Sequence, residues 1–272
     1  MSIPQPEPKK QSKLKRWHKI AIGVVVLVLI AVVAVPFVYI NFIKEDAPDK
    51  LSLDDAPIST SADTTASTTA ATATTTAPVD STGVTTGDTT ATTATAAPAA
   101  GTDGTYTITT DSQVGYRVVE VLFGQDTEGV GRTNSVTGTI TVAGTQVTAA
   151  EFTVDMASVT SDESRRDGQF RGRLMETDTF PTATFTITQP IELGAIPADG
   201  EEISASATGD LTLHGVTKSV TLDVTAKKTG TSIAIAGSTD IKFADYDIED
   251  PSTNGISVQD HGLLEFLLVA NA

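Results

Sequence analysis

The chain has 272 residues, with 18 lysines and arginines against 34 aspartates and glutamates, so its net charge is −16. This acidic balance argues against a nucleic-acid-binding protein, because contacts to phosphate need lysine and arginine. The absence of cysteine excludes disulfides, thiolate catalysis and zinc sites built on thiolates.

A basic segment opens the chain. Residues 1–19 contain a single acidic residue, Glu7, and six basic ones: Lys9, Lys10, Lys13, Lys15, Arg16 and Lys19. Such a cluster before an apolar helix favours a cytoplasmic N-terminus. We therefore expect a short cytoplasmic segment at residues 1–19.

Residues 20–43 form an uncharged apolar run of 24 residues. At about 1.5 Å per residue, a helix of this length reaches about 36 Å, enough for the about 30 Å of a hydrocarbon core. The sequence thus predicts a single-pass transmembrane helix that leaves the C-terminal part outside the cytoplasm, at the cell membrane. A cleaved signal peptide is the alternative, although its apolar region is usually shorter, about 7–15 residues.

Within residues 44–104, the stretch 59–100 is about two-thirds threonine and alanine, includes scattered prolines and has no apolar period. Such a segment cannot bury enough surface to offset its ordering entropy, so we expect a disordered linker. A flexible coil of this length spans roughly 40–45 Å. Its threonine density suits either an O-glycosylated stalk or an unmodified linker.

From residue 105 to residue 272 the sequence alternates between apolar and polar residues, which predicts β-strands. One face of most strands is apolar and the other is rich in threonine, typical of antiparallel sheet with one wet side. The last strand, near residues 263–269, is apolar on both faces. A barrel or a sandwich fits this pattern. We favour an all-β, eight-stranded antiparallel barrel, whose closure removes exposed edges and whose interior can hold one small ligand.

Residues 163–177 depart from the strand pattern. Phe170, Leu174 and Met175 recur at helical spacing among several arginines. We expect a short helix here that caps one mouth of the barrel. The segment 124–134, by contrast, is expected to be a loop.

Three stretches of the domain resemble motifs of the YceI family, whose members are lipocalin-like and bind polyisoprenoids. Residues 112–118 resemble S-x-V-x-F-x-V, residues 166–185 resemble R-D-x-x-L followed by F and P-x-x-x-F, and residues 209–218 resemble G-x-L-T-x-x-G-V-T-K. The resemblance covers about residues 105–270. It implies a long apolar cavity and the binding of an isoprenoid chain, such as a polyprenyl or an isoprenoid quinone. Glu120 stands where the family often has histidine, so the resemblance does not specify the headgroup of the bound lipid.

The inward apolar residues are the candidates for the lining of such a cavity, although in many small barrels they simply fill the interior. The predicted lining comprises Val118, Ile140, Phe152, Val154, Phe170, Leu174, Phe185, Ile187, Leu211, Leu213, Leu222, Val224, Phe243 and Phe266. Arg166 and Asp167 are placed at the cavity mouth, either to orient a headgroup or to tie the helix to the rim. Thr217 and Lys218 are expected in a turn.

We expect a membrane-anchored, extracytoplasmic lipid-binding protein, and neither a catalytic nor a metal site. Only three histidines are present, and no nucleophile elbow of the G-x-S-x-G type occurs. No cofactor is expected besides a bound isoprenoid lipid. The main alternative is a stalked interaction module with a packed, ligand-free barrel, and a further one is a lipocalin-like enzyme that acts on an apolar substrate.

Overall fold

The computed structural model describes residues 17, 20–28, 34, 38, 47–58, 103–122, 124–253 and 255–272. The predicted cytoplasmic segment, except Trp17, and residues 59–102 of the predicted linker lie outside these ranges. Of the predicted membrane span, residues 20–28, 34 and 38 are described, and all are helical. Within the described ranges, no helix combines the length and the apolar character that crossing a bilayer would need.

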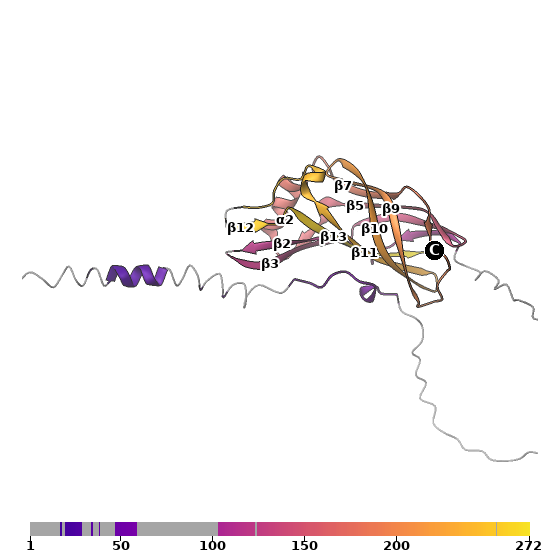
Figure 1. Ribbon diagram of the computed structural model, residues 1–272, viewed down its shortest axis with the longest axis horizontal. Coiled ribbons are helices and arrows are strands. Elements are labelled where there is room, and N and C mark those ends of the chain that lie inside the picture. Colours follow the sequence, from indigo (N-terminus) through magenta and orange to yellow (C-terminus); the bar gives the residue numbers. More distant parts are fainter. Residues whose placement is uncertain are drawn as a thin grey trace, which may run out of the picture.

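The described part of the domain is built on one antiparallel sheet of 13 strands (Figure 1). The strands are β1 (Gly104–Ile108), β2 (Gln113–Leu122), β3 (Gln125–Thr133), β4 (Val136–Ala143), β5 (Gln146–Asp155), β6 (Thr160–Ser161), β7 (Thr182–Ile187), β8 (Ile191–Glu192), β9 (Glu202–Leu213), β10 (Val216–Thr229), β11 (Ser232–Lys242), β12 (Ile256–Val258) and β13 (His261–Asn271). Alternating burial along most of them follows the period of two in the sequence.

Eight of these strands close into a barrel in the order β1, β4, β5, β7, β9, β10, β11 and β13, because β1 also pairs with β13. The pair β2 and β3 extends the wall, since β2 pairs with β13 beyond β1 and β3 leads directly into β4. The expected eight-stranded antiparallel barrel is therefore confirmed.

Two segments differ from their predicted structure. Residues 125–133 form strand β3 and not a loop; glycines and charged residues hide its alternation. Thr217 and Lys218 lie in β10 and not in a turn, because the turn before β10 is made by His214 and Gly215, both at positive φ. His214 thus adopts the left-handed backbone conformation that usually favours glycine.

The expected short helix is α2 (Ser164–Gln169), which continues as one wider turn, η4 (Phe170–Leu174). Glu163 caps its start by accepting a hydrogen bond from the backbone amide of Arg165 at 3.2 Å. Helix α2 follows β6, which pairs with β3, so the helix lies at the end of the barrel where β2 and β3 turn into each other (Figure 1). We call this end the mouth.

The opposite end of the barrel, where β4 meets β5 and β10 meets β11, is packed with apolar side chains. Tyr106 and Ile140 are almost fully buried there, and Ile187, Ile233 and Ile235 pack against the same core. This end is therefore filled by its own side chains.

Residues 47–58, called the strap here, lie against the outer wall of the barrel (Figure 1). Their central turn, η2 (Leu53–Asp55), buries Leu53 against Ala234, Ala236 and Leu267. The linker expected at residues 44–104 thus contains an ordered part, because Leu51, Leu53 and Ile58 pack on an apolar patch of the barrel.

Candidate functional site

A cavity of about 1170 Å³ opens at the mouth and runs into the barrel. Its size exceeds the about 300–1000 Å³ of typical small-molecule pockets. Strand β2 lines it from Val114 to Leu122, eight residues apart, which corresponds to a depth of about 27 Å at about 3.4 Å per residue. The cavity is therefore long as well as large.

The walls of the cavity are mostly apolar, and most of the predicted lining residues contribute to them. Eleven of the fourteen line the cavity: Val118, Phe152, Val154, Phe170, Leu174, Phe185, Leu211, Leu213, Leu222, Phe243 and Phe266. The other three, Ile140, Ile187 and Val224, belong to the packed core beside it. Alternation in the sequence predicts that a side chain points inward, but it does not predict the depth at which the barrel becomes filled.

Aromatic rings connect the helix at the mouth to the cavity wall. Phe170, at the end of α2, stacks on Tyr116 of β2 with ring centroids 5.1 Å apart and planes 12° apart. Phe152 and Phe185 stack in the same way deeper in the barrel, at 6.4 Å. Burial raises the pKa of Tyr116, although the positive charge of Arg166 opposes this effect. Tyr116 therefore stays neutral and contributes a largely apolar surface.

Strand β3 makes room for these side chains with two glycines. A Cβ atom at Gly131 would collide with the ring of Tyr116, and one at Gly129 would lie 2.5 Å from Oε1 of Glu120. The glycines thus let the tyrosine ring and the carboxylate lie flat against β3. This requirement explains why β3 lacks the apolar alternation by which the other strands were recognised.

An ion-pair network joins α2 to the rim of the mouth. Arg166 donates through Nε and Nη2 to the two carboxylate oxygens of Glu120, both at 3.3 Å, and through Nη1 to Oδ1 of Asp162 at 2.5 Å. Burial alone would lower the pKa of Arg166, but the adjacent Glu120 and Asp162 outweigh it, so that the pKa is raised. Arg166 is therefore a fixed cation whose hydrogen bonds are already used within the protein.

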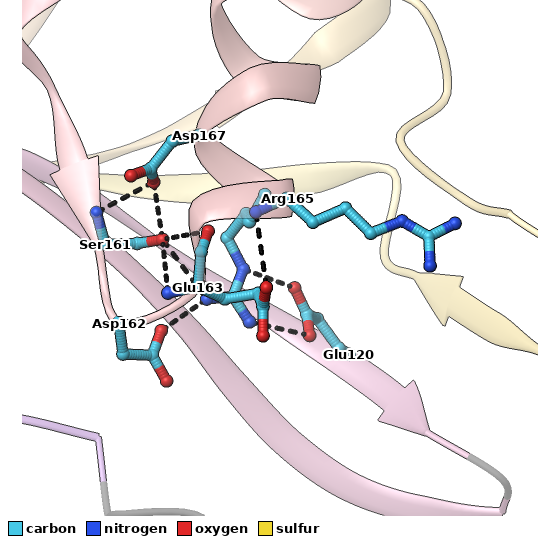
Figure 2. Close-up of polar contacts among 7 residues, drawn as sticks. Glu120, Ser161, Asp162, Glu163, Arg165 and Asp167 are labelled. Carbon is cyan, nitrogen blue, oxygen red and sulfur yellow. Dashed lines mark hydrogen bonds and ion pairs between the residues drawn. The ribbon is translucent and has the colours of Figure 1, made fainter.

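The carboxylate of Asp167 is likewise hydrogen-bonded within the protein. Its Oδ1 accepts hydrogen bonds from the backbone amide of Ser161 at 2.8 Å and from the Ser161 hydroxyl at 2.7 Å (Figure 2). It is buried and does not line the cavity. Of the two residues predicted at the mouth, Arg166 lines the cavity while it ties α2 to β2, and Asp167 holds the turn before the helix.

Arg165 was not singled out by the sequence, yet it lines the mouth. Figure 2 shows its side chain extending away from the Glu120 carboxylate and from the Asp167–Ser161 contact. Among the described residues its guanidinium has neither a hydrogen bond nor an ion pair. It is an exposed cation beside the opening and is available to a polar group outside the barrel. Glu120, noted only as a departure from the family pattern, lines the same opening.

Comparison with known proteins supports the fold and the family. The model of the YceI-like domain family matches residues 58–270, more than three-quarters of the chain. A polyisoprenoid binding domain from Saccharophagus degradans, implicated in plant cell wall breakdown, superposes with a TM-score of 0.52 at 25% sequence identity, covering 61% of this chain and 98% of that one.

Two relatives match shorter stretches. A UPF0312 protein of Vibrio vulnificus is 32% identical over 127 residues, 43% of this chain and 64% of that protein. Protein YceI of Shigella flexneri is 40% identical over 72 residues, 26% of this chain and 34% of that protein. The chain therefore matches less than two-thirds of the length of either relative.

Proposed function

Because the chain belongs to the family of YceI-like domains, we propose that its cavity holds the apolar chain of an isoprenoid lipid, a polyprenyl or an isoprenoid quinone. The observation that carries this proposal is the long apolar cavity, closed at one end and open at a polar mouth. The similarity to a polyisoprenoid binding domain supports the choice of an isoprenoid.

Burial of the chain supplies the binding energy. Each five-carbon isoprene unit that moves from water into the cavity contributes about 4 kcal/mol, at about 0.8 kcal/mol per carbon. A packed, ligand-free barrel, as the alternative of a pure interaction module requires, does not fit a cavity of about 1170 Å³. A barrel that holds a ligand is thus favoured over a packed interaction module.

The headgroup stays at the mouth and meets Arg165. The apolar walls are closed to a charged group, because an unpaired charge in such surroundings is strongly destabilised. Arg165 offers an exposed guanidinium at the opening, whereas the guanidinium of Arg166 is held by Glu120 and Asp162. We therefore assign Arg165, and not Arg166 or Asp167, to contact with a phosphate or carbonyl headgroup.

Residues 20–43 anchor the protein in a membrane, with residues 1–19 on the cytoplasmic side and the barrel outside. Seven apolar side chains between Ile20 and Val28 are exposed all around the helix. A helix that is apolar on every side needs an apolar solvent. The basic residues that precede it favour this orientation.

A lipid exchange assay tests the proposed ligand. The full chain, stripped of lipid and returned to mild detergent, is offered a polyprenol, a menaquinone or a straight-chain alcohol of equal carbon number. We expect stable retention of the two isoprenoids in preference to the straight chain. Uptake of none of the three would overturn lipid binding, and preference for the straight chain would overturn the assignment to isoprenoids.

A further inference from the structure

The strap covers a patch that the barrel alone would leave exposed. Strand β13 is apolar on both faces near its C-terminal end, and its outward Leu267 is only 3% exposed because Leu53 packs on it together with Ala234 and Ala236. The strap lies almost wholly outside the residues that match the family, which begin at residue 58.

Charged side chains fix the strap at a second point. Glu265 on the outer face of β13 is 1% exposed and binds Arg132 at 2.7 Å and Arg117 at 3.6 Å. Both arginines also donate to strap carbonyls, Arg117 to that of Pro48 at 2.5 Å and Arg132 to that of Asp49. The buried carboxylate thus orients two cations that hold the backbone of the strap.

These contacts give the strap a direction along the barrel. Leu53 lies on Leu267, which pairs with Gln113 at the start of β2, whereas Pro48 is bound by Arg117, four residues further along β2. Strand β2 continues from there to Leu122 at the mouth. The N-terminal end of the strap therefore points toward the mouth (Figure 1).

The length of the chain before the strap limits where the membrane can be. Residue 43, the last of the proposed membrane span, is five residues before Pro48, and a fully extended chain covers at most about 18 Å over that length. Arg117 is also five residues from Leu122, about 17 Å along an extended strand. The end of the span thus lies no farther from Pro48 than about the distance to the mouth.

We propose that the strap holds the mouth of the cavity at the membrane surface, so that lipid passes between the outer leaflet and the barrel without crossing open water. This inference rests on the membrane anchor proposed above. The strap, and not residues 59–102, then sets the distance between the barrel and the membrane.

The orientation comes from the chain and not from charge. The exposed rim of the mouth carries Asp126, Asp162 and Glu163. Arg165 is an exposed cation beside them, but the acidic residues outnumber it, so the charge of the rim does not draw it to an anionic lipid surface. On a long free tether, these charges would therefore not turn the mouth of the barrel toward the bilayer. The strap supplies an orientation that the charge of the rim does not supply.

Site-specific fluorescence in vesicles tests the proposal. The chain contains no cysteine, so that Val121→Cys at the mouth and Thr231→Cys at the far end each supply a single labelling position. The full chain carrying an environment-sensitive fluorophore is reconstituted into phosphatidylcholine–phosphatidylglycerol vesicles whose headgroups bear a nitroxide quencher. We expect quenching at position 121 to be severalfold stronger than at position 231.

Two insertion variants distinguish a strap that orients the barrel from a tether that only links the barrel to the membrane. A Gly/Ser segment of about 20 residues, with a span of about 25 Å, is placed directly before Ala47 or, as the matched control, within residues 59–102. We expect the first insertion to abolish the difference between positions 121 and 231 and the second to leave it unchanged. Both insertions leave the packed residues intact, so neither relies on a destabilised barrel.

Each outcome decides a different part of the account. Equal effects of the two insertions, or equal quenching at both positions in the parent chain, would overturn the strap proposal and leave lipid binding untouched. A chain that does not sediment with the vesicles would overturn the anchor and this inference together. Lipid retention, measured on the same samples after detergent extraction, reports on the proposed function independently.

Discussion

On the inner wall of the barrel, β13 presents Leu264, Phe266 and Leu268 to a cavity of about 1170 Å³, whereas on the outer wall it presents Glu265 and Leu267 to the strap. The side chains on the outer face are covered by the strap, and Ala234 in the same patch is fully buried. The side chains on the inner face leave space for a ligand. The same strand thus uses one face for stability and the other for binding, and substitutions on the two faces have different consequences.

The largest effect is expected on the outer wall, at Glu265. Glu265→Gln removes the charge that Arg117 and Arg132 share, and breaking a buried ion pair in this way costs about 3 kcal/mol of the free energy of unfolding. Urea denaturation measures this loss. Glu128→Gln, which affects Arg117 from a half-exposed position, is expected to cost under about 1 kcal/mol. Similar losses in the two variants would contradict a buried triad.

Leu53→Ala is expected to cost about 2 kcal/mol, because it removes the side chain that fills the outer patch. Hydrogen exchange of the amides in residues 47–58 is expected to accelerate, while lipid retention per folded molecule stays unchanged. Leu51→Ala, at a partly buried position of the strap, serves as the control with a smaller effect. Unchanged exchange in Leu53→Ala would show that the strap does not depend on this contact.

On the inner wall, Leu222→Trp is expected to reduce the bound lipid at least about tenfold, or about 1.4 kcal/mol, because the larger side chain occupies the cavity. Quantitative mass spectrometry of extracted lipid measures the change. Thr221→Trp adds the same side chain to the exposed outer face of β10 and is expected to leave lipid retention as it is. Equal lipid loss from both variants would place the ligand outside the barrel.

At the mouth, Arg165→Gln is expected to weaken the retention of an isoprenoid phosphate about fivefold, or about 1 kcal/mol, with no change for the uncharged polyprenol. Arg166→Gln is expected to lower stability instead, since it leaves Glu120 and Asp162 without their cation. Competition between the two lipids on each variant measures the difference. The reverse assignment of effects would restore Arg166 as the headgroup contact.

The smallest effect is expected at the far end of the barrel, where Asp199 accepts hydrogen bonds from Lys228 and from the backbone amide of Gly230. These bonds lower the pKa of Asp199. A lowered pKa means that the carboxylate stabilises the fold above its unfolded pKa, about 3.9, and that this contribution is lost as the pH falls through the folded pKa. Asp199→Asn should therefore be slightly less stable than the parent at pH 7 and equal to it under strongly acidic conditions. Lipid retention is expected to be the same in both proteins.

The sequence predicts the strands of this barrel better than it predicts the strap and the charged contacts at the mouth. The period of two identifies β4, β5, β7, β10 and β11, because a barrel strand has one wet face and one apolar face. The same rule fails at β3, where Gly129 and Gly131 make room for neighbouring side chains, and this space requirement has no periodic signal. Ile140, Ile187 and Val224 point inward as predicted but lie beside the cavity, since the point where packing ends depends on the summed volumes of all strands.

The strap could be anticipated only in part. The last strand is apolar on both faces, which indicates that something must cover its outer face. The covering residues lie more than 200 positions earlier, at the start of the segment that was predicted to be a linker. Local pattern carries no information on such a distant contact. At the mouth, likewise, the sequence places three charged residues side by side, and only their hydrogen bonds distinguish the occupied Arg166 and Asp167 from Arg165.

Native mass spectrometry of the full chain, released from its own membrane in a mild detergent, tests the central claim most directly. The account predicts a species with one added mass that matches an isoprenoid lipid, that persists at collision energies which remove detergent, and that is lost in Leu222→Trp but kept in Thr221→Trp. Detection of the protein without any added lipid mass, although its membrane is rich in such lipids, would contradict a lipid held within the barrel. So would an adduct that Leu222→Trp and Thr221→Trp both leave unchanged.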